Sequence, residues 1–292
     1  MNKLSFLLVL LGAILWGTTG TAQYFAPDEA HPVAVGTMRL AVGGTVLFMI
    51  GLMTKKVASI EWPVKTILLA ACAMAAYQPL FFSAVATTGV AIGTVVAIGS
   101  APLMTGLIEW IVYRRRPIRQ WWIATSLSIL GCILLFVTQG TIELDPMGFI
   151  LALGAGFAFS TYTLVNKDIV KKVAPEMAVA VVFTIAAIIL SPLLFVFDVS
   201  WVTELNGLLV VLQLGIVATA IAYLLFVKGL MGIPASTAVT LSLAEPLTAA
   251  LLGVAIVGEV LTLWASLGVF LIFAGLAVLI YTPKKAVLKR SA

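Results

Sequence analysis

Long apolar runs divide the sequence into ten segments. A helix that crosses a hydrocarbon core of about 30 Å needs roughly 20 residues, and each run has about that length. The runs predict helices near residues 4–25, 32–53, 64–85, 90–111, 119–138, 147–166, 175–197, 206–227, 235–256 and 262–281. Membrane β-strands would instead alternate apolar and polar positions over about ten residues. We therefore expect an all-α membrane protein with ten transmembrane helices.

The first run also has features of a secretory signal peptide. Lys3 precedes it, and Thr21-Ala22 could serve as a cleavage site. Its apolar stretch is longer than the roughly 7–15 residues of such signals. The internal repeat described below also requires this helix, so we interpret it as the first membrane span.

The composition agrees with a membrane protein and argues against several other classes. Hydrophobic residues make up 62% of the 292 residues and charged residues 10%, against about 45–50% and 25% in soluble domains. This balance argues against a soluble enzyme, a disordered chain and a nucleic-acid-binding protein. His31 is the only histidine, and Cys72 and Cys132 lack metal-ligand spacing, so we expect no metal site.

Lysine and arginine residues gather on one side of the predicted helices. If the N-terminus is inside, 16 of the 17 basic residues lie in or beside inner segments. They are Lys3, Lys55, Lys56, Lys65, Arg114, Arg115, Arg116, Arg119, Lys167, Lys171, Lys172, Lys228, Lys284, Lys285, Lys289 and Arg290. The outer loops hold Asp28, Glu29, Glu143, Asp145, Asp198, Glu204 and Glu259. By the positive-inside rule, we predict a cytoplasmic (inner) membrane protein with both termini in the cytoplasm, and we read the net charge of +5 as an orientation signal.

The two halves of the chain share residues at a nearly constant offset. Leu11-Gly12-Ala13 recurs 142 residues later, Gly89 and Thr94 recur 143 residues later as Gly232 and Thr237, and Pro102 and Gly131 recur 144 residues later as Pro246 and Gly275. Each copy holds five spans, so the second must enter the membrane from the opposite side. We predict that residues 1–140 and 141–292 form two inverted five-helix repeats, an architecture that recurs in secondary transporters.

Two ionisable residues lie deep in the predicted spans, where the bilayer does not solvate them. Glu245 lies about ten residues, or roughly 15 Å, into the ninth span and shares a helical face with Ser242. It could contact a substrate amine, carry a coupled proton or hold helices together. Arg39 lies on the order of 10 Å into the second span. It could contact a substrate carboxylate, pair with Glu245 or snorkel outward.

Aromatic and amide groups away from the predicted membrane surfaces suit a pocket for a zwitterion or a flat organic molecule, although helix packing would also explain each one. With the ionisable and hydroxyl groups they form the candidate substrate-binding set: Trp16, Thr19, Arg39, Tyr77, Gln78, Tyr162, Tyr223, Ser242 and Glu245. Pro102 and Pro246 occupy equivalent positions in the two halves. Each removes a backbone donor, so both are candidate hinges.

Residues 214–280, with Ala244-Glu245-Pro246 and Gly258-Glu259, resemble the EamA domain of the drug/metabolite transporter superfamily. Residues 11–136 resemble a more divergent second copy, in which Pro102 lacks the preceding glutamate and Arg115 replaces the second glutamate. The resemblance implies ten helices, a central substrate cavity and, in bacterial members, export of amino acids or related metabolites.

A secondary transporter is therefore the leading interpretation. The sequence has no GxxxxGK[ST] loop, so transport would draw on the substrate's own gradient or on a coupled ion such as H⁺. An intramembrane enzyme would need a nucleophile–base pair or metal ligands, so we expect neither catalysis nor a cofactor. An importer, a drug or amine efflux carrier and a channel-like facilitator are the alternatives. The expected partners are a small-molecule substrate and the lipid bilayer, with no obligate protein partner.

Overall fold

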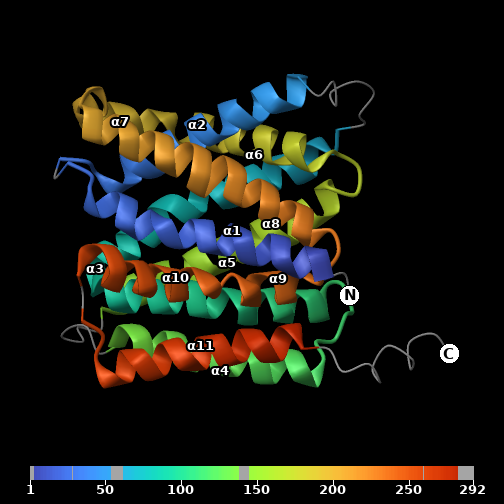
Figure 1. The fold of residues 1–292 in the computed structure, drawn as a ribbon. Coiled ribbons are helices and arrows are strands. Elements are labelled where there is room, and N and C mark those ends of the chain that lie inside the picture. The colour runs from blue at the N-terminus through green and yellow to red at the C-terminus, as the bar shows by residue number, and fades with distance from the viewer. Residues whose placement is uncertain (1–2, 28, 54–61, 138–144, 259, 282–292) are drawn as a thin grey trace.

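The computed structural model describes residues 3–27, 29–53, 62–137, 145–258 and 260–281 as a bundle of helices (Figure 1). The first half contains α1 (Lys3–Tyr24), α2 (Pro32–Met53), α3 (Val64–Ile111) and α4 (Arg119–Val137). The second half contains α5 (Pro146–Ile169), α6 (Pro175–Leu190), η1 (Ser191–Phe195), η2 (Ser200–Thr203), α7 (Leu205–Leu212), η3 (Gln213–Ile221), α8 (Ala222–Leu230), α9 (Ala235–Leu241), α10 (Ala244–Leu252), η4 (Gly253–Val257) and α11 (Leu263–Ile280).

These elements make ten membrane crossings. α3 contains two arms, Val64–Gly89 and Ile92–Ile111, which are joined at Gly89 with φ +80°. This backbone conformation favours glycine. The segments α7–η3–α8 and α9–α10–η4 each make one crossing. In the described chain, nine segments are long and apolar enough to span a membrane, and α4 contributes a shorter apolar one. The predicted all-α fold with ten transmembrane helices is therefore confirmed.

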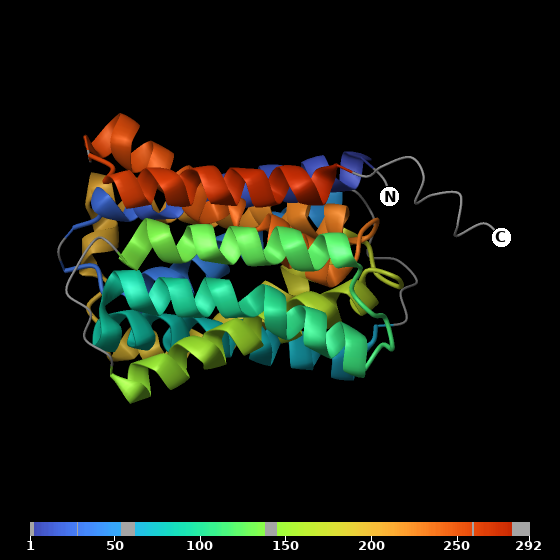
Figure 2. The ribbon, with the colours of Figure 1, turned by 90° about the horizontal axis from the view of Figure 1, so that it is seen from below.

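The main helix pairings join the first half of the chain to the second. α1 packs against α8 and α10, α2 against α6, α3 against α5, and α4 against α11. Figures 1 and 2 both show α4 and α11 side by side at one edge of the bundle. Each half therefore supplies much of the surface that buries the other.

The contacts between α4 and α11 are reciprocal. A Cβ added to Gly131 would meet the backbone N of Ile272 at 2.7 Å, and a Cβ added to Gly275 would meet the backbone N of Ser128 at 3.0 Å. With the repeat offset of 144 residues, Gly131 corresponds to Gly275 and Ser128 corresponds to Ile272. The two halves therefore meet through equivalent surfaces, as a pseudo-two-fold axis between inverted repeats requires.

The two ends of the bundle differ in charge. We call the end formed by residues 112–118, 170–174 and 231–234 the basic end, and the opposite end, with residues 29–31, 196–204 and 260–262, the distal end. The described basic residues other than Arg39 lie at or near the basic end, and Glu29, Asp145, Asp198 and Glu204 lie at or near the distal end. Lys55, Lys56, Lys284, Lys285, Lys289, Arg290, Asp28, Glu143 and Glu259 lie outside the described residues. The assignment of the basic end to the cytoplasm stays a prediction, as does the boundary at residue 140.

The two candidate hinge prolines have different surroundings. α9 and α10 are separated just before Pro246, where the N–H of Glu245 donates to Ser242 O at 2.9 Å. Pro102 instead lies within the second arm of α3, whose helical backbone is interrupted at Gly89. The hydroxyl of Ser160 on α5 donates to Ala101 O at 2.9 Å and so ties the arm beside Pro102 to its neighbour. The expected pair of equivalent interruptions is thus found at Pro246 alone, and the hinge role stays a prediction.

The close approach of α4 and α11 predicts that the stability of the protein is sensitive to substitution of Gly131. Gly131→Ala should destabilise the protein by about 1–3 kcal/mol, because the added methyl group would force the two backbones apart. Thermal unfolding of the purified protein in detergent should show a lower Tm. Gly20→Ala is the matched control, since a Cβ there meets nothing within 4 Å. Equal melting temperatures for the two variants would contradict the expected tight contact.

Candidate functional site

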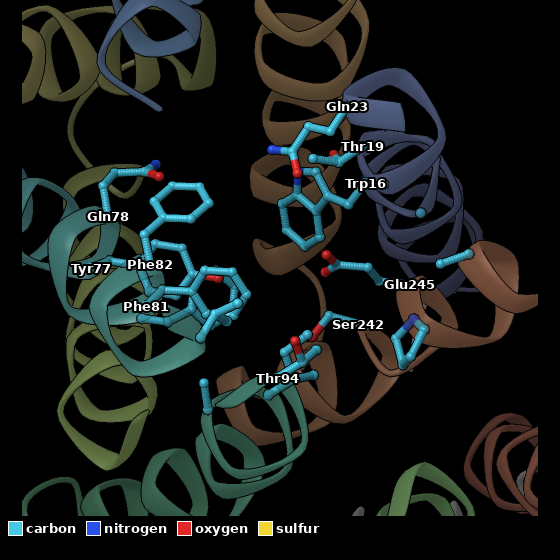
Figure 3. Close-up of a pocket in the computed structure, with 18 of the residues that line it drawn as sticks. Trp16, Thr19, Gln23, Tyr77, Gln78, Phe81, Phe82, Thr94, Ser242 and Glu245 are labelled. Carbon is cyan, nitrogen blue, oxygen red and sulfur yellow. The ribbon is translucent and has the colours of Figure 1, made fainter. Parts of the chain in front are cut away.

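A cavity of about 400 Å³ lies between the two halves of the chain. Its inner part is lined by Ala101 and Ser242 near the middle of the bundle, and its outer part by Gln23 and Pro32 at the distal end. Figure 3 shows side chains from α1 and from α3 facing each other across this space, with Glu245 projecting into it. The cavity therefore runs from the middle of the bundle toward the distal end.

Eight of the nine predicted binding residues line this cavity. They are Trp16, Thr19, Arg39, Tyr77, Gln78, Tyr223, Ser242 and Glu245. Pro246 also lines the cavity. The fold thus brings together groups from five helical segments that are widely separated in the sequence, while their role in binding stays a prediction.

Tyr162 is the predicted binding residue that the structure places elsewhere. Its side chain is fully buried, and its ring packs against Tyr223 with centroids 5.9 Å apart. Its hydroxyl accepts a hydrogen bond from Asn166 Nδ2 at 2.8 Å. Tyr162 therefore lies behind the cavity wall and supports Tyr223 from the second half of the bundle.

The two deep charges face the same cavity. Arg39 is 8% exposed and lines the cavity, so it does not snorkel to the membrane surface. Among the ion pairs of the described residues, none joins Arg39 to Glu245. In the same part of the chain, no three His, Cys, Asp or Glu side chains gather as metal ligands. Arg39 and Glu245 are the charged residues in the cavity lining, and the other lining residues are neutral.

Three donor atoms in the cavity-lining residues have no hydrogen-bond partner among the described residues. They are Trp16 Nε1, Arg39 Nε and Gln78 Nε2. Buried polar atoms are usually satisfied, so such a group of orphan donors needs an explanation. Each of these N–H groups can donate to an acceptor supplied from outside the chain, such as a ligand oxygen.

Aromatic side chains that the sequence analysis did not select complete the cavity wall. Phe81 and Phe82 line it together with Phe159. The Tyr77 and Phe81 rings stack with centroids 5.7 Å apart. Phe81 and Phe82 follow Tyr77 and Gln78 by four residues each, a spacing that places side chains on one helical face and could have identified them.

Two buried carboxylates near the basic end were also missed, so Arg39 and Glu245 are not the only buried or cavity-lining ionisable groups among the described residues. Glu109 is 4% exposed and accepts hydrogen bonds from the N–H groups of Ala235 and Ser236, both at 3.0 Å. Glu176 is 5% exposed and pairs with Lys228 at 2.8 Å. A carboxylate at the end of an apolar run was the available signal.

A tyrosine–aspartate bond also joins the two halves at the basic end. Tyr113 donates its hydroxyl proton to Asp168 Oδ2 at 2.8 Å. Burial, and then the hydrogen bond and charge of Asp168, raise the pKa of Tyr113 to about 12. The hydroxyl therefore remains a protonated donor across the physiological pH range.

Comparison with known proteins identifies the family. A model described as the EamA-like transporter family matches residues 3–137 and again residues 146–281. The chain belongs to the EamA-like transporter family. This confirms the resemblance seen in the sequence, and the chain is a multi-pass membrane transporter.

Individual relatives agree with this assignment. The uncharacterized transporter YwfM of Bacillus subtilis is 49% identical over 279 residues, which cover 96% of this chain and 94% of the relative. The threonine/homoserine exporter RhtA of Salmonella typhimurium is 33% identical over 185 residues, which cover 63% of this chain and 60% of the relative. A solved crystal structure at 21% identity superposes with a TM-score of 0.84, covers 95% of this chain and 96% of its own, and shows the same fold.

The position of Tyr162 predicts a structural effect of its removal. Tyr162→Phe should lower the free energy of unfolding by about 1–3 kcal/mol, because Asn166 Nδ2 would lose its buried acceptor. Thermal unfolding measures this effect, with Tyr281→Phe as the control because Tyr281 is 75% exposed. An unchanged Tm for Tyr162→Phe would show that the hydrogen bond to Asn166 contributes nothing.

Proposed function

We propose that this EamA-family transporter exports amino acids or closely related zwitterions by alternating access around the cavity. The observation that carries the proposal is the placement of Arg39 and Glu245, which face one aromatic cavity without forming an ion pair with each other. An α-amino acid carries one carboxylate and one ammonium group. A bound amino acid would neutralise the charges of Arg39 and Glu245 at the same time.

The chemistry of each group supports these roles. A guanidinium can bind a carboxylate through two parallel hydrogen bonds, so Arg39 is suited to the substrate carboxylate. The unpaired donors of Trp16 and Gln78 offer further neutral hydrogen bonds to substrate oxygen atoms. Glu245 is suited to the ammonium group, and the aromatic wall can pack against the substrate side chain. The exporter function in the name of the relative RhtA agrees with an amino-acid substrate.

The architecture supports alternating access. The two halves are related by a pseudo-two-fold axis and surround the cavity, so an exchange of their conformations would move the opening from the distal end to the basic end. Binding drives such an exchange only if the substrate interacts differently with the two states. We propose that the basic end faces the cytoplasm, in agreement with the positive-inside rule.

The first test concerns recognition of the carboxylate. Wild-type protein in liposomes loaded with an unlabelled amino acid should take up the labelled amino acid by saturable counterflow, and threonine and homoserine are the first compounds to use. Arg39→Gln should slow this exchange by roughly tenfold or more, since a charge-assisted bond is lost. It should slow exchange of the corresponding amine, which lacks the carboxylate, far less.

The control for this test is Glu204→Gln, which removes a charge from an exposed residue outside the cavity. It should leave the exchange unchanged. Non-saturable flux would contradict the carrier mechanism and favour a channel. Equal slowing of amino acid and amine by Arg39→Gln would contradict the assignment of Arg39 to the carboxylate and favour an amine carrier.

The second test concerns the driving force. We propose that Glu245 exchanges a proton for the substrate ammonium group, so that inward proton movement drives export. Net transport by the wild type should then increase with an imposed pH gradient. Glu245→Gln cannot carry the proton and should lose this dependence. A variant that keeps the full pH dependence would exclude Glu245 as the proton carrier.

A further inference from the structure

The cavity is closed toward the basic end by a layer of buried side chains. Ala101 and Ser242 line the inner end of the cavity. Glu109 lies eight residues beyond Ala101, and Ser236 lies six residues before Ser242, which place them about 12 Å and 9 Å nearer the basic end at 1.5 Å per residue. Thr105, between Ala101 and Glu109, is fully buried. The packing around Thr105 therefore separates the cavity from the basic end.

Glu109 stabilises the side of this layer that faces the basic end. Its carboxylate, on α3 of the first half, accepts two backbone N–H bonds from Ala235 and Ser236 of the second half, and the Ser236 hydroxyl donates a third bond to it. Hydrogen bonds to a charged group are shorter and stronger than neutral ones. Three of them on one buried carboxylate make this a firm connection between the halves.

An independent bond closes the same end. Tyr113, one helical turn beyond Glu109, donates to Asp168 at the end of α5. This bond also joins the first half to the second. The halves cannot separate at the basic end unless both the Glu109 and the Tyr113 connections break.

The symmetry-related position at the distal end has no such connection. Under the offset of 144 residues, Glu109 corresponds to Gly253, because 109 + 144 = 253. Under the offset of 143 residues, Ser236 corresponds to Gly93, because 236 − 143 = 93. Both counterparts are glycines, which carry no side chain to form an equivalent bond. Closure of the distal end would therefore lack the charged connection that holds the basic end closed.

We propose that Glu109 is a one-sided latch that holds the basic end closed and biases the transporter toward the state that is open at the distal end. This proposal rests on the proposed alternating-access function. Entry of a substrate from the basic end requires the latch to open first. The fraction of molecules with an open latch would then scale the apparent affinity for substrate on that side.

The latch predicts opposite changes in accessibility at the two ends. In a background without Cys72 and Cys132, Thr105→Cys reports on the layer below the cavity, and Gln23→Cys reports on the distal opening. With the latch intact, a water-soluble maleimide should label the first reporter slowly and the second rapidly. Glu109→Gln should speed labelling at position 105 by about tenfold or more, through loss of charged hydrogen bonds, and should slow labelling at position 23.

Asp145→Asn is the matched control for the chemical change. Asp145 also accepts a hydrogen bond at a helix N-terminus, from Met147 N at 2.9 Å, but within one half of the chain. It should leave both labelling rates unchanged. Ser236→Ala and Tyr113→Phe each remove part of the closure and should change both rates in the same directions as Glu109→Gln, by smaller factors. They keep the test available if Glu109→Gln does not fold.

Two results would overturn the latch. Unchanged labelling at both reporters in all three variants would show that Glu109 is a static helix cap. Faster labelling at both reporters would show general loosening rather than an exchange between two states. The measurement needs no substrate, so it stays interpretable even if amino-acid counterflow is absent and the proposed function fails.

Discussion

The lack of water inside the bilayer is the constraint on which this structure depends. Apolar side chains gain little by leaving lipid for the protein interior, so helices associate through close backbone packing and internal hydrogen bonds. In this chain the resulting contacts join the two halves, as at Gly131 on α4 and Ile272 on α11. The halves therefore fold against each other, and the polar groups gather along the surface between them.

The location of the cavity follows from the same constraint. An isolated charge in hydrocarbon is expensive, and a residue such as Arg39 is tolerated where it faces a protein interior or a polar cavity. Arg39 and Glu245 come from different halves and both line the cavity on that inner surface. A site shared by both halves changes shape whenever they move relative to each other, which links binding directly to the conformational cycle of a transporter.

The sequence predicts depth along a helix well and neighbours across helices poorly. Runs of apolar residues locate all ten crossings, and depth singles out Arg39 and Glu245. The direction in which a side chain points around the helix axis is harder to predict, because most helices here are apolar on every side. Tyr162 and Tyr223 have similar depth, yet one is buried behind the wall and the other lines the cavity. The bonds of Glu109 to residues about 126 positions away could not be predicted, because they depend on how the two halves meet.

The pairing of α4 with α11 also constrains how the protein is made. Ribosomes synthesise α4 long before α11, and the Gln120 amide that donates to Val278 O at 2.6 Å has no such acceptor until the last helix arrives. α4, with Gly131, therefore stays in the membrane without this partner while roughly 140 further residues are synthesised. Contacts between segments so distant in sequence form late and slowly. The native packing of α4 is thus completed only when the final helix of the second half is in place.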